Sequence, residues 1–265
     1  MAFARTLALA ALLAAAGSAQ AGLVASDSLN TATAGSLAGQ AGGSGWAGAW
    51  TGSNSVSVVD TGVADGSISG QALRFSGADN TSAATRALEG SISGAKVFVD
   101  FSLQFSAGSI DQNDFLGLWF GSYTGPNIGI KGNCDGAGNC NGADLFVRTT
   151  GSGGSFTTAM TVGTTYHLFA LLEKTNGSSV YNRYSLWVDP TDAERSSLTG
   201  ADAVFTGSSG LSSFSTIGFR TANLDAGDAV LVDALTVGEL PEPATLALAG
   251  AGLLGLAAAR RRKAA

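Results

Sequence analysis

The chain has 265 residues, of which 45% are hydrophobic and 13% charged, and its formal net charge at pH 7 is −6. Its 14 Lys and Arg residues form no cluster outside residues 260–263, which argues against a nucleic-acid-binding protein, because such binding depends on basic side chains that neutralise phosphates. The 38 glycines are compatible with disorder, but four Trp residues and regular apolar blocks indicate a folded domain.

Residues 1–21 have the organisation of a secretory signal peptide. Arg5 supplies a positive charge, residues 7–16 form an apolar run, and Ala19-Gln20-Ala21 provides the small residues that signal peptidase accepts. The apolar run is too short to cross ~30 Å of hydrocarbon, so we expect cleavage after Ala21 rather than an uncleaved anchor.

The domain that remains, residues 22–240, is strongly acidic. Loss of the signal peptide and of the C-terminal tail removes five of the 14 basic residues but only one of the 20 acidic residues, which leaves 9 basic and 19 acidic residues and a net charge near −10. This charge disfavours a polyanionic partner and leaves neutral glycans, cations and self-association open. The length is enough for one domain with a buried core.

Apolar and polar residues alternate in the segment from Val97 to Phe105. The odd-numbered positions are apolar and Asp100, Ser102 and Gln104 lie between them, which indicates a strand with one buried and one solvated face. Comparable blocks occupy residues 56–59, 72–75, 115–120, 145–148, 166–172, 184–188, 217–220 and 230–237. Turn residues separate them, and no segment has a convincing helical period. The sequence therefore predicts an all-β fold, an antiparallel jelly-roll β-sandwich.

Several segments of this domain recur together in one known superfamily. They are the glycine- and tryptophan-rich segment 42–50, the block 72–75, the long central strands and the closing segment 230–238. Over residues 27–239 they resemble the concanavalin A-like, laminin-G-like sandwiches of many secreted bacterial proteins. That superfamily includes lectins, carbohydrate-binding modules, glycosidases and adhesive domains, so the resemblance implies a fold without selecting an activity.

The carboxylates of the domain form no recognisable catalytic motif. Glycoside hydrolysis requires two carboxylates about 5 to 9 Å apart, and glucanases of this superfamily carry Glu-x-Asp-x-x-Glu on one strand, which this chain lacks. Asp100 and Glu173 could meet across a sheet, but two solvated strand positions are the better interpretation. His167, the single histidine, lies in an apolar strand where a hydrogen-bonded structural role is the default. We therefore expect no enzyme.

The two cysteines, Cys134 and Cys140, flank a short glycine-rich loop. Exported chains meet an oxidising compartment, and such a loop readily brings two sulfurs together, so we predict a disulfide between them. Closing so short a loop stabilises the fold by about 2 to 3 kcal/mol in the chain-entropy model. Two cysteines without a nearby histidine make a zinc site improbable, since structural zinc takes four ligands.

Oxygen-bearing side chains gather around the same loop. They are Asn133, Asp135, Asn139, Asn141 and Asp144. Ca²⁺ takes six to eight oxygen ligands, so Asp135, Asn139, Asn141 and Asp144 are candidate calcium ligands, with Asp111, Asn113 or Asp114 as additional ones if they fold alongside. The alternative is that Asn, Asp and Gly are simply the residues that tight turns favour. We expect no cofactor unless this loop binds Ca²⁺.

Two tryptophans in alternating strands, Trp119 and Trp187, are the candidates for stacking on a sugar ring. Trp187 lies on the opposite side of its strand from Tyr184 and Leu186, which favours an outer or concave face. A loop or the second sheet can also cover such a ring, and packing in a core is the competing interpretation for both residues.

The tail begins with Pro241-Glu242-Pro243. Residues 244–259 follow as an apolar stretch, and residues 260–263 are Arg-Arg-Arg-Lys. This order predicts a transmembrane helix with its basic end on the cytoplasmic side. The stretch has 16 residues against the ~20 of a comfortable span, which suits a thin bilayer or a temporary anchor.

Together these features resemble the PEP-CTERM sorting signal of Gram-negative bacteria. The resemblance implies processing at or near the motif by an exosortase, a membrane protease, and passage from an inner-membrane intermediate to the cell surface or extracellular matrix. A single-pass anchor that is never cut is the alternative.

The combined expectation is a non-catalytic structural or adhesive protein associated with exopolysaccharide. The alternative is a carbohydrate-binding, lectin-like module that uses Trp187 or Trp119 and is calcium-assisted. A glycoside hydrolase with an unfamiliar carboxylate pair ranks third. Expected partners are the processing protease, extracellular polysaccharide and, before processing, the membrane; nucleic acid is not expected.

Overall fold

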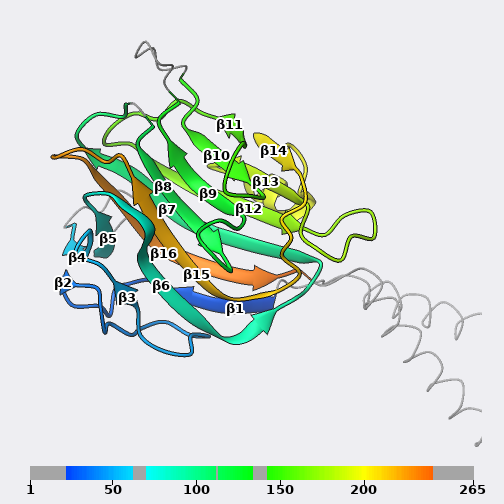
Figure 1. Ribbon diagram of the computed structural model, residues 1–265, viewed down its shortest axis with the longest axis horizontal. Helices are drawn as coiled ribbons and strands as arrows, with labels where there is room; N and C mark the ends of the chain where they lie inside the picture. The colour runs from blue at the N-terminus through cyan, green and yellow to red at the C-terminus, as the bar shows by residue number, and fades with distance from the viewer. Residues whose placement is uncertain (1–21, 62–69, 112, 134–141, 241–265) are drawn as a thin grey trace, which may run out of the picture.

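The computed structural model describes residues 22–61, 70–111, 113–133 and 142–240. These residues form two antiparallel β-sheets that pack face to face, with one short helix (Figure 1). The predicted antiparallel β-sandwich is confirmed. The expected signal helix, the sorting motif Pro241-Glu242-Pro243 and the expected transmembrane helix lie outside the described residues.

The large sheet has nine strands in the order β14-β13-β12-β7-β16-β5-β4-β2, with β1 also paired to β16. The bounds are β1 Gly22–Asp27, β2 Gly35–Ser36, β4 Val56–Asp60, β5 Gln71–Phe75, β7 Lys96–Ala107, β12 Thr165–Glu173, β13 Arg183–Val188, β14 Ala203–Thr206 and β16 Ala229–Glu239.

The small sheet has seven strands in the order β11-β10-β9-β8-β15-β6-β3. The bounds are β3 Thr51–Gly52, β6 Asp79–Ile92, β8 Phe115–Phe120, β9 Asn127–Lys131, β10 Leu145–Arg148, β11 Ser155–Thr157 and β15 Phe214–Ala222.

The core lies between the two sheets and follows the alternation of the strands. On β7, Val99 and Phe101 are buried in the core, whereas Asp100 lies on the outer face. From the small sheet Phe219 meets Phe101 edge to face, with ring centroids 6.5 Å apart. Such ring pairs add to the apolar burial that holds the two layers together.

The first and last described strands lie side by side. Gly22 at the start of β1 pairs with Glu239 at the end of β16, and Asp27 pairs with Leu235 (Figure 1). The two ends of the described domain therefore lie next to each other, at the same end of these two strands.

One helix, α2 (Asp192–Ser197), interrupts the all-β pattern. The side chain of Thr191 accepts from the backbone N–H of Glu194, the Glu194 carboxylate accepts from the N–H of Thr191, and Leu198 ends the helix at φ 55°. This capping box satisfies the first N–H groups of a helix too short to show a period in the sequence. The sequence shows no helical period in this segment, and these six residues are an addition to the predicted all-β fold.

Among the residues with described positions, no helix is both long and apolar enough to cross a membrane.

Candidate functional site

The outer face of the small sheet, which points away from the core, carries an unusual set of side chains. Along β8, Leu116 and Leu118 enter the core, so Phe115 and Trp119 lie on the outer face. β8 pairs with β9 and β15, β9 pairs with β10, and β10 pairs with β11; these strands add further members. We call the set the outer-face cluster: Phe115, Trp119, Asn127, Lys131, Phe146, Arg148, Phe156 and Arg220.

Strand register fixes how the cluster is arranged. Trp119 pairs with Asn127, and Asn127 in turn pairs with Arg148. One step along the sheet, Arg220 pairs with Gly117. β8, β9 and β10 are consecutive in the chain and β15 joins them from much later in the sequence, and these four strands bring two arginines and their aromatic neighbours onto one surface.

Two glycines give the aromatic rings room to lie against the sheet. A Cβ atom at Gly117 would stand 2.6 Å from the ring of Phe115, and one at Gly218 would stand 2.4 Å from the ring of Trp119. These distances are below any real contact, so a larger residue at either position would push a ring off the sheet.

The cations of the cluster stack on its rings. The Arg148 guanidinium lies 5.0 Å from the Phe115 centroid and 4.9 Å from that of Phe146. Arg220 lies 4.7 Å from the Phe115 centroid on the neighbouring strand. Lys131 is more loosely placed, 6.0 Å from the ring of Phe156. Cation–π attraction therefore holds the positive charges on this face.

Several donors of the cluster have no acceptor. Arg148 Nε donates to Asn127 Oδ1 at 2.7 Å, but Arg148 Nη2, Arg220 Nε and Trp119 Nε1 are buried and make no hydrogen bond. Leaving a buried donor without a partner costs about 1 to 3 kcal/mol. In the described part of the chain, neither arginine is within ion-pair distance of a carboxylate.

The two arginines also affect each other's charge. Burial and, to a smaller extent, the positive charge of Arg220 together lower the pKa of Arg148 to about 10. Burial lowers the pKa of Arg220 as well, against a smaller opposite effect of Tyr123. A pKa near 10 still leaves Arg148 protonated at neutral pH, so the face carries positive charge that no carboxylate among the described residues pairs with.

The cluster reaches solvent on one side. Phe115, Phe146 and Arg148 are buried, whereas Arg220 and Lys131 are half-buried. A ligand on this face therefore meets Arg220 and Lys131 before it meets Arg148.

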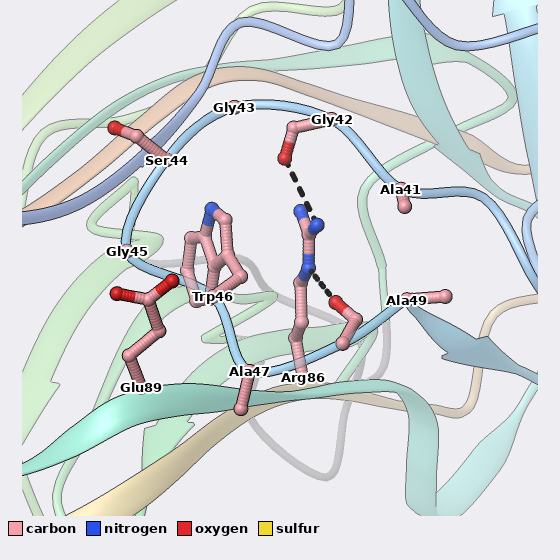
Figure 2. A pocket seen from close by; sticks show the side chains of 11 residues that line it. Ala41, Gly42, Gly43, Ser44, Gly45, Trp46, Ala47, Ala49, Arg86 and Glu89 are labelled. Atoms are coloured by element: carbon pink, nitrogen blue, oxygen red, sulfur yellow. Dashed lines mark hydrogen bonds between the residues drawn. The ribbon is translucent and has the colours of Figure 1, made fainter.

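A different arginine, Arg86, lines a pocket of about 380 Å³ together with residues 41–49 and Glu89 (Figure 2). Figure 2 shows Arg86 standing inside the loop, where Nη2 donates to the Gly42 carbonyl and Nε to the Gly48 carbonyl, each at 2.9 Å. Its Nη1 forms a buried ion pair with Asp27. All three guanidinium nitrogens are satisfied, so Arg86 has a structural role and closes the N-terminal loop.

The loop around Arg86 also holds the two tryptophans of segment 42–50 in place. Trp46 and Trp50 stack beside the guanidinium, 4.8 and 5.4 Å from their centroids, and Trp50 Nε1 donates to Asp27. Gly43 has φ +68°, and a Cβ there would stand 1.8 Å from the Ser26 carbonyl oxygen, so only glycine fits.

Trp187 is buried, which supports the packing interpretation over the candidate role as a sugar platform. Its strand parity was right, since it lies on the outer face of the large sheet, but it is only 2% exposed. Nε1 donates to the Thr199 carbonyl at 2.9 Å, and Phe169 packs against its ring with centroids 5.6 Å apart. The segment that contains α2 and Leu198 covers it.

Trp119 lies on the outer face but is only 5% exposed, so it does not present an open ring either. Its indole rests over Gly218 within the outer-face cluster. We therefore assign it a supporting position under the cluster instead of a stacking surface.

Most of the predicted calcium and disulfide residues lie outside the described residues. These are Cys134, Asp135, Asn139, Cys140 and Asn141. The disulfide and the calcium loop therefore stay predictions. Asp144 is described and buried; one carboxylate oxygen accepts from Met160 N at 2.9 Å and the other from Asn133 N at 3.4 Å. Its observed role is to fix the loop backbone.

Asp114 does fold beside this loop, since Gly132 N donates to its carbonyl oxygen at 2.8 Å. Its side chain is fully buried, and Oδ1 has no hydrogen-bond partner. Burial raises the pKa of Asp114 to about 7, with additional effects of Asp228, Asp111 and Asp225. In the regions that the structure places, no group of three or more Asp, Glu, His or Cys residues is arranged to hold a metal ion.

The candidate carboxylate pair of the large sheet is not brought together. Asp100 bonds to His167 and to Arg195 of α2, whereas Glu173 forms ion pairs with Lys96 at 3.3 Å and Arg183 at 3.7 Å. His167 is hydrogen-bonded, as the sequence predicted.

The C-terminal residues 239–263 match the PEP-CTERM protein-sorting motif. No curated protein sequence matches the chain. Among solved structures, the receptor-binding domain of botulinum neurotoxin type G is similar, with 8% identity, coverage of 86% of this chain and 51% of that chain, and a TM-score of 0.51. The chain spans about half the length of the neurotoxin binding domains that it resembles.

Two sugar-bound structures are similar at a lower score. Domain 4 of a GH43 extracellular arabinanase from Geobacillus stearothermophilus, solved with arabinotriose, is 13% identical over 86% of this chain and 97% of that chain, with a TM-score of 0.47. The exoplasmic/lumenal domain of VIP36, solved with Ca²⁺ and Man3GlcNAc, is 12% identical over 73% and 84%, with a TM-score of 0.46.

At these identities the likeness shows the fold alone. The class of protein is therefore a β-sandwich protein with a PEP-CTERM sorting motif, which directly follows the last strand. The motif indicates export and a membrane-anchored sorting intermediate.

Proposed function

We propose that this protein is delivered to the cell surface or extracellular matrix of a Gram-negative bacterium, where its sandwich binds extracellular polysaccharide without catalysis. In this proposal the outer-face cluster is the binding site. An exosortase-type protease processes the tail and releases the domain from the inner membrane.

One observation carries the binding proposal. Three buried N–H groups, on Trp119, Arg148 and Arg220, lie among aromatic rings on one face and have no acceptor in the described structure. Sugar hydroxyl, ring and carboxylate oxygens accept hydrogen bonds, and the C–H face of a sugar packs on aromatic and guanidinium surfaces. A glycan therefore offers acceptors to these three donors and an apolar C–H face to the rings.

The chemistry of the face supports binding over catalysis. Its ionisable groups are Arg148, Arg220 and Lys131, and the pKa of Arg148, at about 10, keeps that group protonated at neutral pH. General acid–base catalysis requires a group that exchanges a proton near the working pH. Elsewhere, Asp100 and Glu173 are held in separate ion pairs.

The test is a titration of the exported form, recovered from the cell surface, against the host's own exopolysaccharide and a glycan panel. We expect saturable binding to at least one polysaccharide. The titration is run with calcium and then with chelator; loss of binding in chelator would assign a calcium-assisted site near Asp144. Absence of saturable binding under both conditions would contradict the proposal and favour a passive structural domain.

A further inference from the structure

We infer that the ligand of the outer-face cluster is an acidic polysaccharide, and that Arg148 and Arg220 bind the carboxylates of its uronate residues. This inference rests on the proposed function and narrows its ligand from any glycan to one chemical class. It also revises the expectation from the net charge of residues 22–240, which disfavoured a polyanionic partner.

The positive charges of the outer-face cluster have no carboxylate partner in the described chain. Arg148 and Arg220 are close enough for each charge to be felt by the other, yet in the described chain no carboxylate pairs with either one. Lys131 adds a third cation on the same face. Buried cations are normally paired with anions, so this arrangement favours an anionic ligand.

Arg86, the other buried arginine of the domain, has bonding partners that the arginines of the outer-face cluster do not have. Arg86 uses Nη1 for Asp27, Nη2 for the Gly42 carbonyl and Nε for the Gly48 carbonyl. The fold thus satisfies a guanidinium completely where that group is structural. On the outer face, Arg148 Nη2 and Arg220 Nε have no acceptor among the described residues, which leaves these donors able to bond to a ligand.

The geometry of the guanidinium groups favours a carboxylate as the anion. A guanidinium presents its N–H groups as a planar fork that matches a carboxylate with two parallel hydrogen bonds. Stacking on Phe115 and Phe146 holds the plane of Arg148, and stacking on Phe115 holds Arg220. The donors are therefore oriented before the ligand arrives, so less conformational entropy is lost on binding.

The positive charge of the outer-face cluster contrasts with the negative net charge of the whole domain. The domain as a whole carries about ten more acidic than basic residues. A polyanion is repelled by most of such a surface and attracted only where cations gather, so electrostatics would direct it to this face.

The test measures binding of the exported form to three probes: polygalacturonate, a neutral β-glucan and dextran sulfate. Arg220→Gln and Arg148→Gln each remove one cation from the face. Arg183→Gln is the matched control, because it removes a charge from β13 of the large sheet, where that side chain is 44% exposed. We expect either cluster variant to weaken polygalacturonate binding at least about tenfold, and the control to leave it unchanged. Added NaCl should weaken the wild-type interaction.

The outcomes separate this inference from the function on which it rests. Equal binding of β-glucan and polygalacturonate, unaffected by the arginine variants, would overturn the acidic-ligand inference and leave the glycan-binding proposal standing. Preference for dextran sulfate would overturn the carboxylate assignment. Failure to bind any glycan would overturn both.

A stability measurement guards against loss of binding through unfolding. Because Arg220→Gln removes like-charge repulsion and a buried donor without a partner, we expect its melting temperature to equal or exceed that of the wild type. Arg220→Lys keeps the charge but loses the fork, so it should bind polygalacturonate more weakly than the wild type while remaining folded. Wild-type affinity in a folded Arg220→Lys variant would overturn the fork geometry.

Discussion

Arg86 and Arg148 are both almost completely buried, at 3% and 5% exposure, yet their surroundings differ in kind. Arg86 is enclosed by its own loop and paired with Asp27, so its charge stabilises the N-terminal segment. Arg148 has one bond, to Asn127, and otherwise contacts rings. The number of unsatisfied donors, rather than burial or charge alone, distinguishes the structural arginine from the one available to a ligand.

A second residue with an unmet requirement is Asp114. Its folded-state pKa, raised to about 7, lies above the ordinary value of 3.8. Between about pH 4 and pH 7 the folded state therefore holds a proton that the unfolded state has lost. Stability from this group is greatest at the acidic end of that window and is lost as the pH rises through 7.

We predict that Asp114→Asn raises the melting temperature at pH 8 by a few degrees, that the gain is smaller at pH 5, and that it disappears near pH 4. Asparagine keeps an acceptor for the N–H of Asp111 and cannot ionise beside Asp228. Thermal melts at pH 5, 6.5 and 8 would measure the difference. Asp192→Asn, which removes an exposed charge from α2, is the control. A gain of the same size at every pH would refute the assignment.

At the scale of elements, α2 determines what the outer face of the large sheet can do. Arg195 of α2 forms an ion pair with Asp100 on β7. Leu198, directly after the helix, packs against the buried cluster of Phe169, Leu171 and Trp187. A segment of only six helical residues thus converts an exposed aromatic surface into a second, smaller core.

We predict that Thr191→Ala lowers the free energy of unfolding by about 1 kcal/mol, the usual value of a helix N-cap. The hydroxyl of Thr191 accepts the N–H of Glu194, and alanine cannot do so. Ser196→Ala is the matched control, since Ser196 donates only to the Ala193 carbonyl within the same helix and caps nothing. Urea denaturation of both variants measures the effect. Equal losses in the two would show that the cap has no special role.

The elements were largely predictable from the sequence, and the site was not. The alternation in β7 indicated a two-faced strand, and the parity of Trp187 placed it correctly on the outer side. Whether that side is open depended on α2, which lies in sequence after β13 and has no buried residue to produce a period.

The outer-face cluster depends on pairing between strands that are distant in sequence. Arg148 ends the strand Leu145–Arg148, and Arg220 lies in Phe214–Ala222, with the register between them set by β8 and β9. A signal was present: each arginine closes an otherwise apolar run with no acidic residue beside it. Single-sequence patterns do not show that the two runs share a face.

At the scale of the whole molecule, the sorting motif follows the sandwich with no linker, since β16 ends at Glu239 and the motif match begins there. We predict that the surface form begins at Gly22 and lacks residues 260–263. Intact-mass analysis of protein released from the cell surface would measure both ends. Retention of the Arg260–Lys263 cluster would refute processing and support a permanent anchor.

The pairing of Gly22 with Glu239 has a consequence for the timing of export. A secreted chain crosses the membrane from its N-terminus, so β1 arrives outside long before β16, its hydrogen-bonding partner in the large sheet. The large sheet cannot be completed until nearly the whole domain has been translocated, at the moment when the tail enters the membrane. We therefore expect folding and membrane arrest to coincide, so that the sorting machinery meets a domain that has just closed.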